Sequence, residues 1–195
     1  MYNSIPSLNK KEGWYLHAKD DHPEVRAKFF ELLREMKGFK VYMVIGRKHL
    51  EIFNKKHNNN ASEFYFDVLH HLLKNRMHLE SESYMLYLAQ REKSTLPKFT
   101  GSIEKALEKQ AVDAKLTYKY VIVKSSEFPE LSVVDYMLWA LMRYIVKGEA
   151  RFYEALKDKY GLIIDLYDRD NYEDRKNYYW SDNRFAKEKA SSFEP

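Results

Sequence analysis

The alternation of apolar and polar positions predicts helices and strands that follow one another along the chain. Apolar residues recur at helical spacing in five stretches, 21–37, 60–77, 100–116, 131–147 and 149–159. Short apolar runs predict three core strands at 39–45, 83–89 and 118–123. The first shows little alternation, as expected for a strand covered on both faces, and the second is expected to be buried as well. The run 162–166 predicts a last short strand, and 49–59 fits one helical turn followed by a loop at 55–59.

Strands that alternate with helices indicate an α/β fold with a mainly parallel sheet flanked by helices. Three core strands are few for such a sheet. We therefore expect a further strand in the N-terminal residues, or strands supplied by a second copy or by a partner chain. The expected organisation is an N-terminal arm at 1–13, a single α/β domain at 14–167 and an aromatic-rich extension at 168–195. The extension has no Leu, Ile, Val or Met but carries six aromatic residues, which we expect to lie over the domain.

The composition removes several classes of protein. The chain has 195 residues and no cysteine, which excludes disulfides, thiolate zinc sites and cysteine nucleophiles. Its 33 basic and 29 acidic side chains give a net charge of +4, which permits nucleic-acid binding without requiring it. No apolar run reaches the roughly 18 residues that span a bilayer, and residues 1–13 lack the apolar core of a signal peptide. We expect a cytoplasmic protein with no membrane association.

One carboxylate lies within the most apolar helix. Between Leu131 and Val146 the only charged residues are Asp135 and Arg143. An unpaired carboxylate on a buried helix face costs several kcal/mol, so such a group is usually paired, metal-bound or near an opening. Two interpretations stay open: Ser132 and Asp135 form a capping box that opens the helix, or Asp135 is a ligand or reacting group.

Basic residues follow the predicted core strands. In a parallel sheet the carboxyl ends of the strands meet at one edge, where ligands bind. Those ends carry 46–48, 90–93 and 124–126, so the candidate nucleic-acid contacts are Arg47, Lys48, Arg91 and Lys124. The alternative is that these are solvated loop charges. The histidines other than His17 show no metal-ligand spacing.

Four stretches of the chain resemble a large prokaryotic family of uncharacterised proteins. They are YLHAKDDHPEVRAKFFELL (15–33), VYMVIGRKHL (41–50), YMLYLAQRE (84–92) and the long stretch from SSEFPELSVVDYMLWALMRYIVKG to IIDLYD (125–168). The C-terminal stretch 171–189 is similar as well. The family is the domain-of-unknown-function 3800 family, which is grouped with the ribonuclease-H-like fold.

The resemblance implies a ribonuclease-H-like, metal-dependent nuclease, in other words a phosphodiesterase that uses Mg²⁺ or Mn²⁺. Such a site needs several carboxylates around two ions. Asp135 matches the acidic residue of the family's last helix, which makes it a catalytic and metal-ligand candidate. His17 lies in the matching LHA stretch, where it has either a functional role or a role in packing or at the surface.

Two family positions have no counterpart in this chain. The Asp-Glu-Ser-Gly strand that usually opens family members is not found, and residues 46–48 stand where a second acid is expected. The N-terminal meander is therefore expected to be missing or incomplete. Two functions follow: a nuclease with Asp135 in its site, or a non-catalytic domain that binds nucleic acid or protein.

Overall fold

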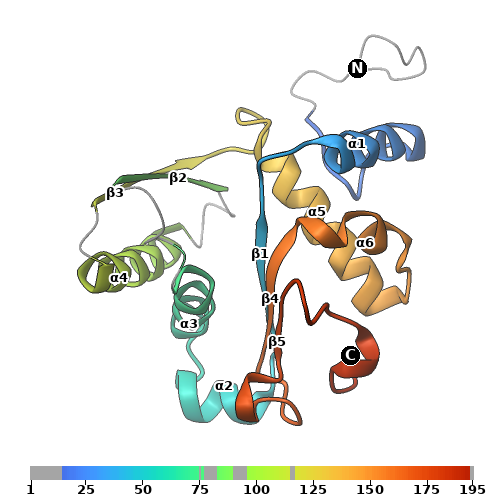
Figure 1. Cartoon of the computed structure of the whole chain (residues 1–195). Helices are drawn as coiled ribbons and strands as arrows, with labels where there is room; N and C mark the ends of the chain where they lie inside the picture. The colour runs from blue at the N-terminus through green and yellow to red at the C-terminus, as the bar shows by residue number, and fades with distance from the viewer. Residues whose placement is uncertain (1–14, 75, 77–82, 90–95, 115–116, 194–195) are drawn as a thin grey trace.

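The computed structural model describes residues 15–74, 76, 83–89, 96–114 and 117–193. Helices and strands alternate through this part of the chain (Figure 1). The helices are α1 (Pro23–Glu35), α2 (Leu50–His57), α3 (Ala61–Leu73), α4 (Leu96–Ala114), α5 (Leu131–Lys147) and α6 (Arg151–Leu156). The strands are β1 (Val41–Gly46), β2 (Ser83–Ala89), β3 (Thr117–Val123), β4 (Tyr160–Leu166) and β5 (Tyr178–Tyr179).

The strands form two small sheets. In the first sheet β4 lies in the centre, with β1 parallel to it on one side and β5 antiparallel on the other. The second sheet is the parallel pair β2–β3. The predicted α/β class with parallel pairing is therefore confirmed. The expectation of one sheet is wrong, because β4 rather than β2 lies beside β1.

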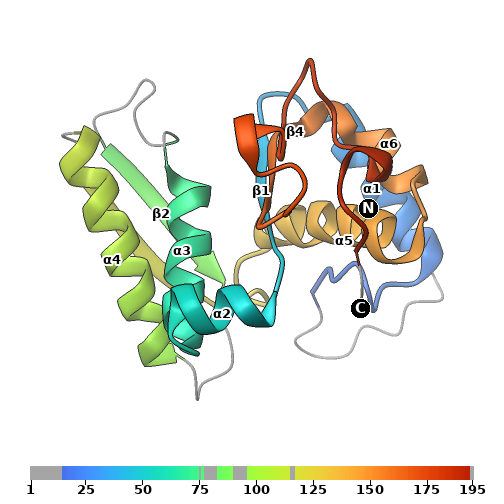
Figure 2. The same cartoon turned by 90° about the horizontal axis from the view of Figure 1, so that it is seen from below.

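Helices cover the first sheet on both faces (Figures 1 and 2). On one face α1, α5 and α6 build the main core, with buried side chains that include Phe29, Leu33, Tyr136, Met137, Ala140 and Tyr153. On the other face, Phe64 of α3 packs against Ile164 and Leu166 of β4. β1 contributes Met43 to the first core and Val44 to the second. Burial on both faces explains why this strand shows little alternation.

A separate apolar cluster joins the second sheet to α3 and α4. Ile103 and Leu107 of α4 are buried against Tyr84, Leu86, Leu88, Tyr118 and Tyr120. The opposite face of β2–β3 leaves Met85, Tyr87 and Val121 between 41% and 48% exposed. The expectation that strand 83–89 is buried is therefore wrong, because only one face of β2 is covered and its residues alternate between partly buried and exposed.

Helix α5 has the predicted bounds, but it does not begin with a capping box. The N-cap is Glu130, whose side chain makes no capping hydrogen bond. Ser132 lies within the helix, and its hydroxyl donates to the carbonyl of Leu16 at 2.9 Å. The helix ends at Gly148, which has the left-handed φ of 69° that glycine adopts most easily.

Two other helix starts show how local residues set the bounds. Asn60 caps α3 by accepting a hydrogen bond from the Ser62 amide at 2.9 Å. Helix α2 continues to His57, so the loop predicted from residue 55 begins only at Asn58, where φ is 51°. His57 is 2% exposed and packs among Phe53, Phe64 and Tyr167, so tertiary contacts extend this helix.

The residues after β4 pack back onto the domain. Tyr179 and Phe185 belong to the main core, and the Tyr153 hydroxyl donates to the Phe185 carbonyl at 3.1 Å. The part of the extension that ends at Phe193 thereby crosses the carboxyl end of the first sheet. None of the helices in the described ranges has the length and apolar character needed to cross a membrane.

Candidate functional site

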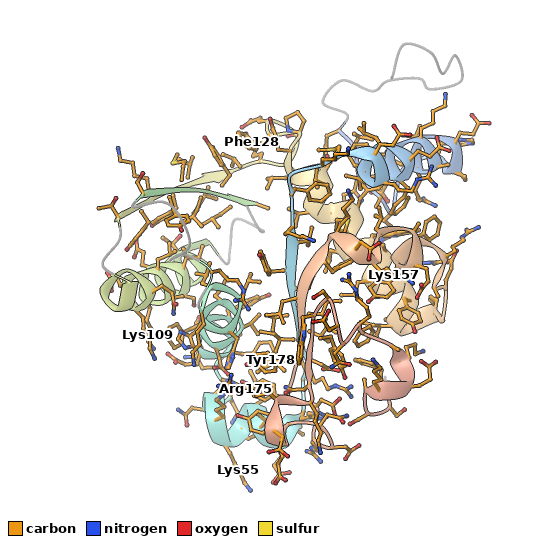
Figure 3. The ribbon with its side chains drawn as sticks, viewed as in Figure 1. Lys55, Lys109, Phe128, Lys157, Arg175 and Tyr178 are labelled. Carbon is orange, nitrogen blue, oxygen red and sulfur yellow. The ribbon has the colours of Figure 1, made fainter. Side chains whose placement is uncertain are left out.

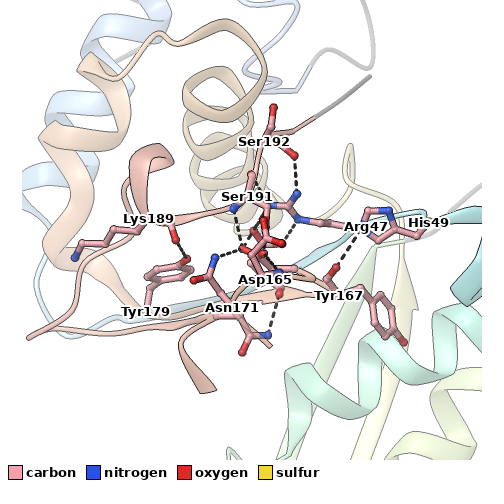
Figure 4. Close-up of polar contacts among 12 residues, drawn as sticks. Arg47, His49, Asp165, Tyr167, Asn171, Tyr179, Lys189, Ser191 and Ser192 are labelled. Carbon is pink, nitrogen blue, oxygen red and sulfur yellow. Dashed lines mark hydrogen bonds and ion pairs between the residues drawn. The ribbon is translucent and has the colours of Figure 1, made fainter. Parts of the chain in front are cut away.

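A buried ion pair connects the ends of β1 and β4 (Figure 4). Arg47 follows β1, and Asp165 lies in β4 opposite Ile45. The Arg47 Nε and Nη2 atoms donate to the two carboxylate oxygens of Asp165, each at 2.8 Å. The two side chains are 7% and 0% exposed. Arg47, expected as a nucleic-acid contact, is therefore buried, and its guanidinium is hydrogen-bonded to Asp165 inside the protein.

The same guanidinium also holds the C-terminal segment. Arg47 Nη2 donates to the Ser191 carbonyl and Nη1 to the Ser192 carbonyl, both at 2.9 Å. The ring of Phe193 lies 4.0 Å from the guanidinium carbon. Asp168, which is fully buried, accepts from the Ser191 amide at 3.1 Å, from the Ser191 hydroxyl and from Asn171 Nδ2 at 3.0 Å. This network fastens residues 191–193 over the carboxyl ends of both strands.

The pKa values in this network reflect burial opposed by hydrogen bonds. Burial raises the pKa of Asp165, and the hydrogen bond and charge of Arg47 only partly oppose that rise. Burial acts to lower the pKa of Arg47, but the hydrogen bond and charge of Asp165 outweigh it, so the guanidinium stays charged. For Asp168 burial acts to raise the pKa, yet the hydrogen bonds from Ser191 and Asn171 prevail and lower it.

A cavity of about 550 Å³ opens at this end of the first sheet. Its lining includes Ile45, Lys48, His49, Leu50, Arg169, Asp170 and residues 191–193. Lys48 is exposed and forms no ion pair within the described residues. His49 Nε2 lies 3.1 Å from the Tyr167 carbonyl, and Arg169 lies 3.4 Å from Glu51. The volume suits a small ligand, and the excess of cationic side chains favours an anionic one.

The other predicted basic residues do not join Lys48. Lys124 follows β3 in the second sheet and pairs with Glu127 at 2.8 Å. Phe128, a few residues further on, lies at the opposite end of the molecule from Lys55 of α2 (Figure 3). The expected single basic edge is therefore not formed by Lys48 and Lys124, because their strands belong to different sheets. Arg91 lies outside the described residues.

His17 and Asp135 come together at the N-terminal part of α5. The Ala18 amide donates to Asp135 Oδ2 at 2.8 Å, and His17 Nε2 lies 3.9 Å from Asp135 Oδ1. Both side chains are about one-third exposed, at 34% and 33%. The second ring nitrogen of His17 lies 3.5 Å from Asp20 Oδ2. These two residues were singled out from distant parts of the sequence, and the structure places them in one half-open site.

The turn that carries His17 is held by several hydrogen bonds. The amides of Asp20 and Asp21 donate to the His17 carbonyl at 3.0 and 2.9 Å. Asp21 accepts from the His17 amide at 3.0 Å and from the Tyr136 hydroxyl. Arg26 Nε donates to the Ala18 carbonyl at 2.7 Å. Burial raises the pKa of Asp21, although the Tyr136 hydrogen bond acts to lower it. The imidazole is thus presented from a rigid backbone.

The donors around Asp135 do not fit a two-metal centre. One oxygen of Asp135 already accepts a backbone N–H, which leaves one carboxylate oxygen and one imidazole. Two Mg²⁺ or Mn²⁺ ions require several converging carboxylates. Within the described residues there is no group of three or more histidine and acidic side chains that could hold a metal.

Sequence reasoning missed the acidic partners of Arg47. Asp165 interrupts the apolar run 162–166, which is the same signal that singled out Asp135. A carboxylate within a buried strand predicts a buried cation, and Arg47 at the end of the neighbouring strand supplies it.

These observations define an α/β protein with two small sheets, a basic cavity at the carboxyl end of one sheet and a separate His–Asp pair. Comparison of the chain with protein-family models, with curated proteins and with solved structures gives no match.

Proposed function

We propose that this chain is a ribonuclease-H-like domain that acts on nucleic acid, with His17 and Asp135 as its reactive pair. The observation that carries the proposal is that the two side chains, each about one-third exposed, approach to 3.9 Å. His17 stands on a turn that is fixed by the hydrogen bonds of Asp21 and Arg26. Both residues lie in stretches that carry the resemblance to the domain-of-unknown-function 3800 family.

The pair has the chemistry of a general base and the group that positions it. Nδ1 of His17 is buried and lies 3.5 Å from Asp20, so the ring would exchange protons through Nε2. A neutral imidazole can accept a proton there from water as the water attacks a phosphodiester, and it can return a proton to the leaving oxygen. The carboxylate of Asp135, on the same side of the ring, stabilises the imidazolium that forms. The separation of 3.9 Å exceeds a hydrogen bond, and such contacts tighten when substrate binds.

The resemblance also implies Mg²⁺ or Mn²⁺. The described side chains supply too few ligands, so no metal-dependent step is assigned to them. A complete metal centre needs carboxylates from beyond the described residues or from another chain. The edge of β1 that does not face β4 supports this part of the proposal, because no described strand pairs with it. Such an edge can accept a further strand.

The test is cleavage of labelled single-stranded DNA, duplex DNA and RNA in Mg²⁺, in Mn²⁺ and in a chelator. We expect Asp135→Asn and His17→Gln each to lower the cleavage rate by about 10²–10⁴-fold, the usual contribution of acid–base groups. The matched control is Asp182→Asn, which removes an exposed carboxylate far along the chain. Cleavage that survives both site substitutions, or no cleavage under any condition, would contradict catalysis by His17 and Asp135.

A second function, binding without catalysis, is favoured by the cavity beside Lys48. Its cationic lining, with Lys48 free of acidic partners in the described part of the chain, suits the phosphate backbone of a nucleic acid. We expect Lys48→Ala to weaken binding of a labelled oligonucleotide and to lower the slope of log K against log salt by about 1. Lys109→Ala on α4 is the control (Figure 3). Equal affinities of the two variants for the oligonucleotide would show that the cavity beside Lys48 does not bind nucleic acid.

A further inference from the structure

A row of exposed apolar side chains runs the length of α5. Val134, Leu138, Met142 and Val146 are 52%, 53%, 47% and 64% exposed. Residues four apart on a helix lie on one ridge, so these four side chains form a continuous apolar strip, called the α5 ridge below. Single exposed apolar residues are ordinary, but a contiguous strip marks an interaction surface.

The rest of α5 shows that the ridge is not a loosely packed part of the core. Tyr136, Met137, Ala140 and Leu141 are at most 2% exposed and face the main core. Helix α5 therefore has a complete inner face and, in addition, an outer apolar strip. Within the described residues the strip has solvent on its outer side.

The charges beside the ridge are arranged with opposite signs at its two ends. Glu130 and Asp135 lie at its beginning, and Lys147 lies at its end, where Arg143 already pairs with Glu149 of the same chain. A parallel copy of the helix would place like charges together. An antiparallel copy places acids opposite bases and also aligns the two helix dipoles favourably. The ridge is thus complementary to itself in one orientation.

We propose that two copies of this chain form a twofold dimer in which their α5 ridges pack antiparallel. Val134 then faces Val146 of the partner subunit, and Leu138 faces Met142 of the partner subunit. An interface in which the same patch serves both copies is the usual arrangement of a twofold dimer.

The dimer has a consequence for the His17–Asp135 pair. Asp135 follows Val134 directly, so the antiparallel register brings the last turn of the partner helix, with Lys147 of the partner subunit, to the edge of that site. The proposal does not depend on catalysis, because the ridge and its flanking charges are independent of His17.

The first experiment is sedimentation velocity of the full chain over a range of concentrations. We expect a dimer for the unaltered chain and for Leu50→Glu, and a monomer for Leu138→Glu. Leu50 is the matched control, since it is a 74% exposed leucine on α2, away from the ridge. Both glutamates enter exposed positions, so melting temperatures should agree within a few degrees. A monomeric unaltered chain, or a dimer that survives Leu138→Glu, would overturn the proposal.

A second experiment tests the orientation, and it is clean because the chain has no cysteine. Under mild oxidation, Val134→Cys mixed with Val146→Cys should form a disulfide-linked dimer. Neither variant alone should do so, because each new thiol faces a valine in the antiparallel register. Cross-linking of Val134→Cys with itself would overturn the antiparallel arrangement.

Discussion

At the scale of single residues, Arg47 is a cation that joins two strands and the C-terminal segment. It pairs bidentately with Asp165, lies 3.6 Å from Asp168 and donates to two carbonyls of the C-terminal segment. Because Asp165 is fully buried, loss of the guanidinium leaves its carboxylate without a cation, whereas Asp168 keeps its hydrogen bonds from Ser191 and Asn171. The role of this side chain is to hold two strands and the C-terminal residues together.

Arg47→Met should therefore lower the free energy of unfolding by about 3–5 kcal/mol, the usual cost of removing one partner of a buried ion pair. The measurement is urea unfolding at pH 7. Lys48→Met is the matched control, since the neighbouring side chain is exposed, and a surface change of this kind stays within about 0.5 kcal/mol. Equal stability of the two variants would show that the pair does not form.

The buried carboxylate of Asp168 predicts a dependence of stability on pH. Its pKa is below the ordinary value of 3.8 in the folded protein, chiefly because the Ser191 hydrogen bonds outweigh burial. A lowered pKa contributes stability that is present above pH 3.8 and is lost as the pH falls through the folded value. Asp165 and Asp21 have raised pKa values and act with the opposite sign, so the comparison must isolate Asp168.

The comparison is the urea midpoint between pH 6 and pH 2 for the unaltered chain and for Asp168→Asn. We expect the difference between them to be largest near pH 6 and to shrink as the pH drops below about 4. A difference that stays constant over this range would mean that the pKa of Asp168 is the same in the folded and unfolded chain, and a difference that grows as the pH falls would mean that its pKa is raised.

Which residues matter could be predicted from the sequence only in part. Asp135 was singled out because a carboxylate stands in an apolar helix, and His17 because of the resemblance. Their proximity could not be predicted, because nothing local links them. Arg47 was assigned to the surface because its buried partners lie more than a hundred positions away, in β4 and beyond.

At the scale of elements, apolar periodicity predicted the helices and strands well where the segment is buried on one defined face. Helix α5 and strand β2 have the predicted bounds. Helix α2 was underestimated because polar residues 54–58 hide its helical pattern, and packing of His57 extends it. Strand β5 was missed, since two residues carry no period and only pairing with β4 defines them.

Two glycines test whether local backbone conformation sets these bounds. Gly148 ends α5 at φ 69°, and a Cβ there would meet no atom within 4 Å, so alanine costs only the left-handed conformation. We expect Gly148→Ala to destabilise the protein by about 1 kcal/mol. Gly101 lies inside α4, also in open space, and Gly101→Ala should stabilise it by about 0.5–1 kcal/mol. Changes of the same sign would show that the α5 terminus is not built as described.

At the scale of the whole molecule, the α/β class followed from the order of helices and strands, but the pairing of the strands did not. The three predicted core strands are similarly apolar, so their sequences do not show which of them pair with one another. The structure instead pairs β1 with β4 and leaves β2–β3 as a separate pair packed against α3 and α4 (Figure 1). This division separates Lys48 from Lys124, and the reactive site that we propose is the His17–Asp135 pair.

The most direct test of that site is a double-mutant cycle on kcat/KM for the best nucleic-acid substrate, with His17→Gln, Asp135→Asn and both together. If the carboxylate acts through the imidazole, the double variant should lose no more activity than the more damaging single variant. Losses that multiply, or a single variant with undiminished activity, would show that His17 and Asp135 do not work as one unit.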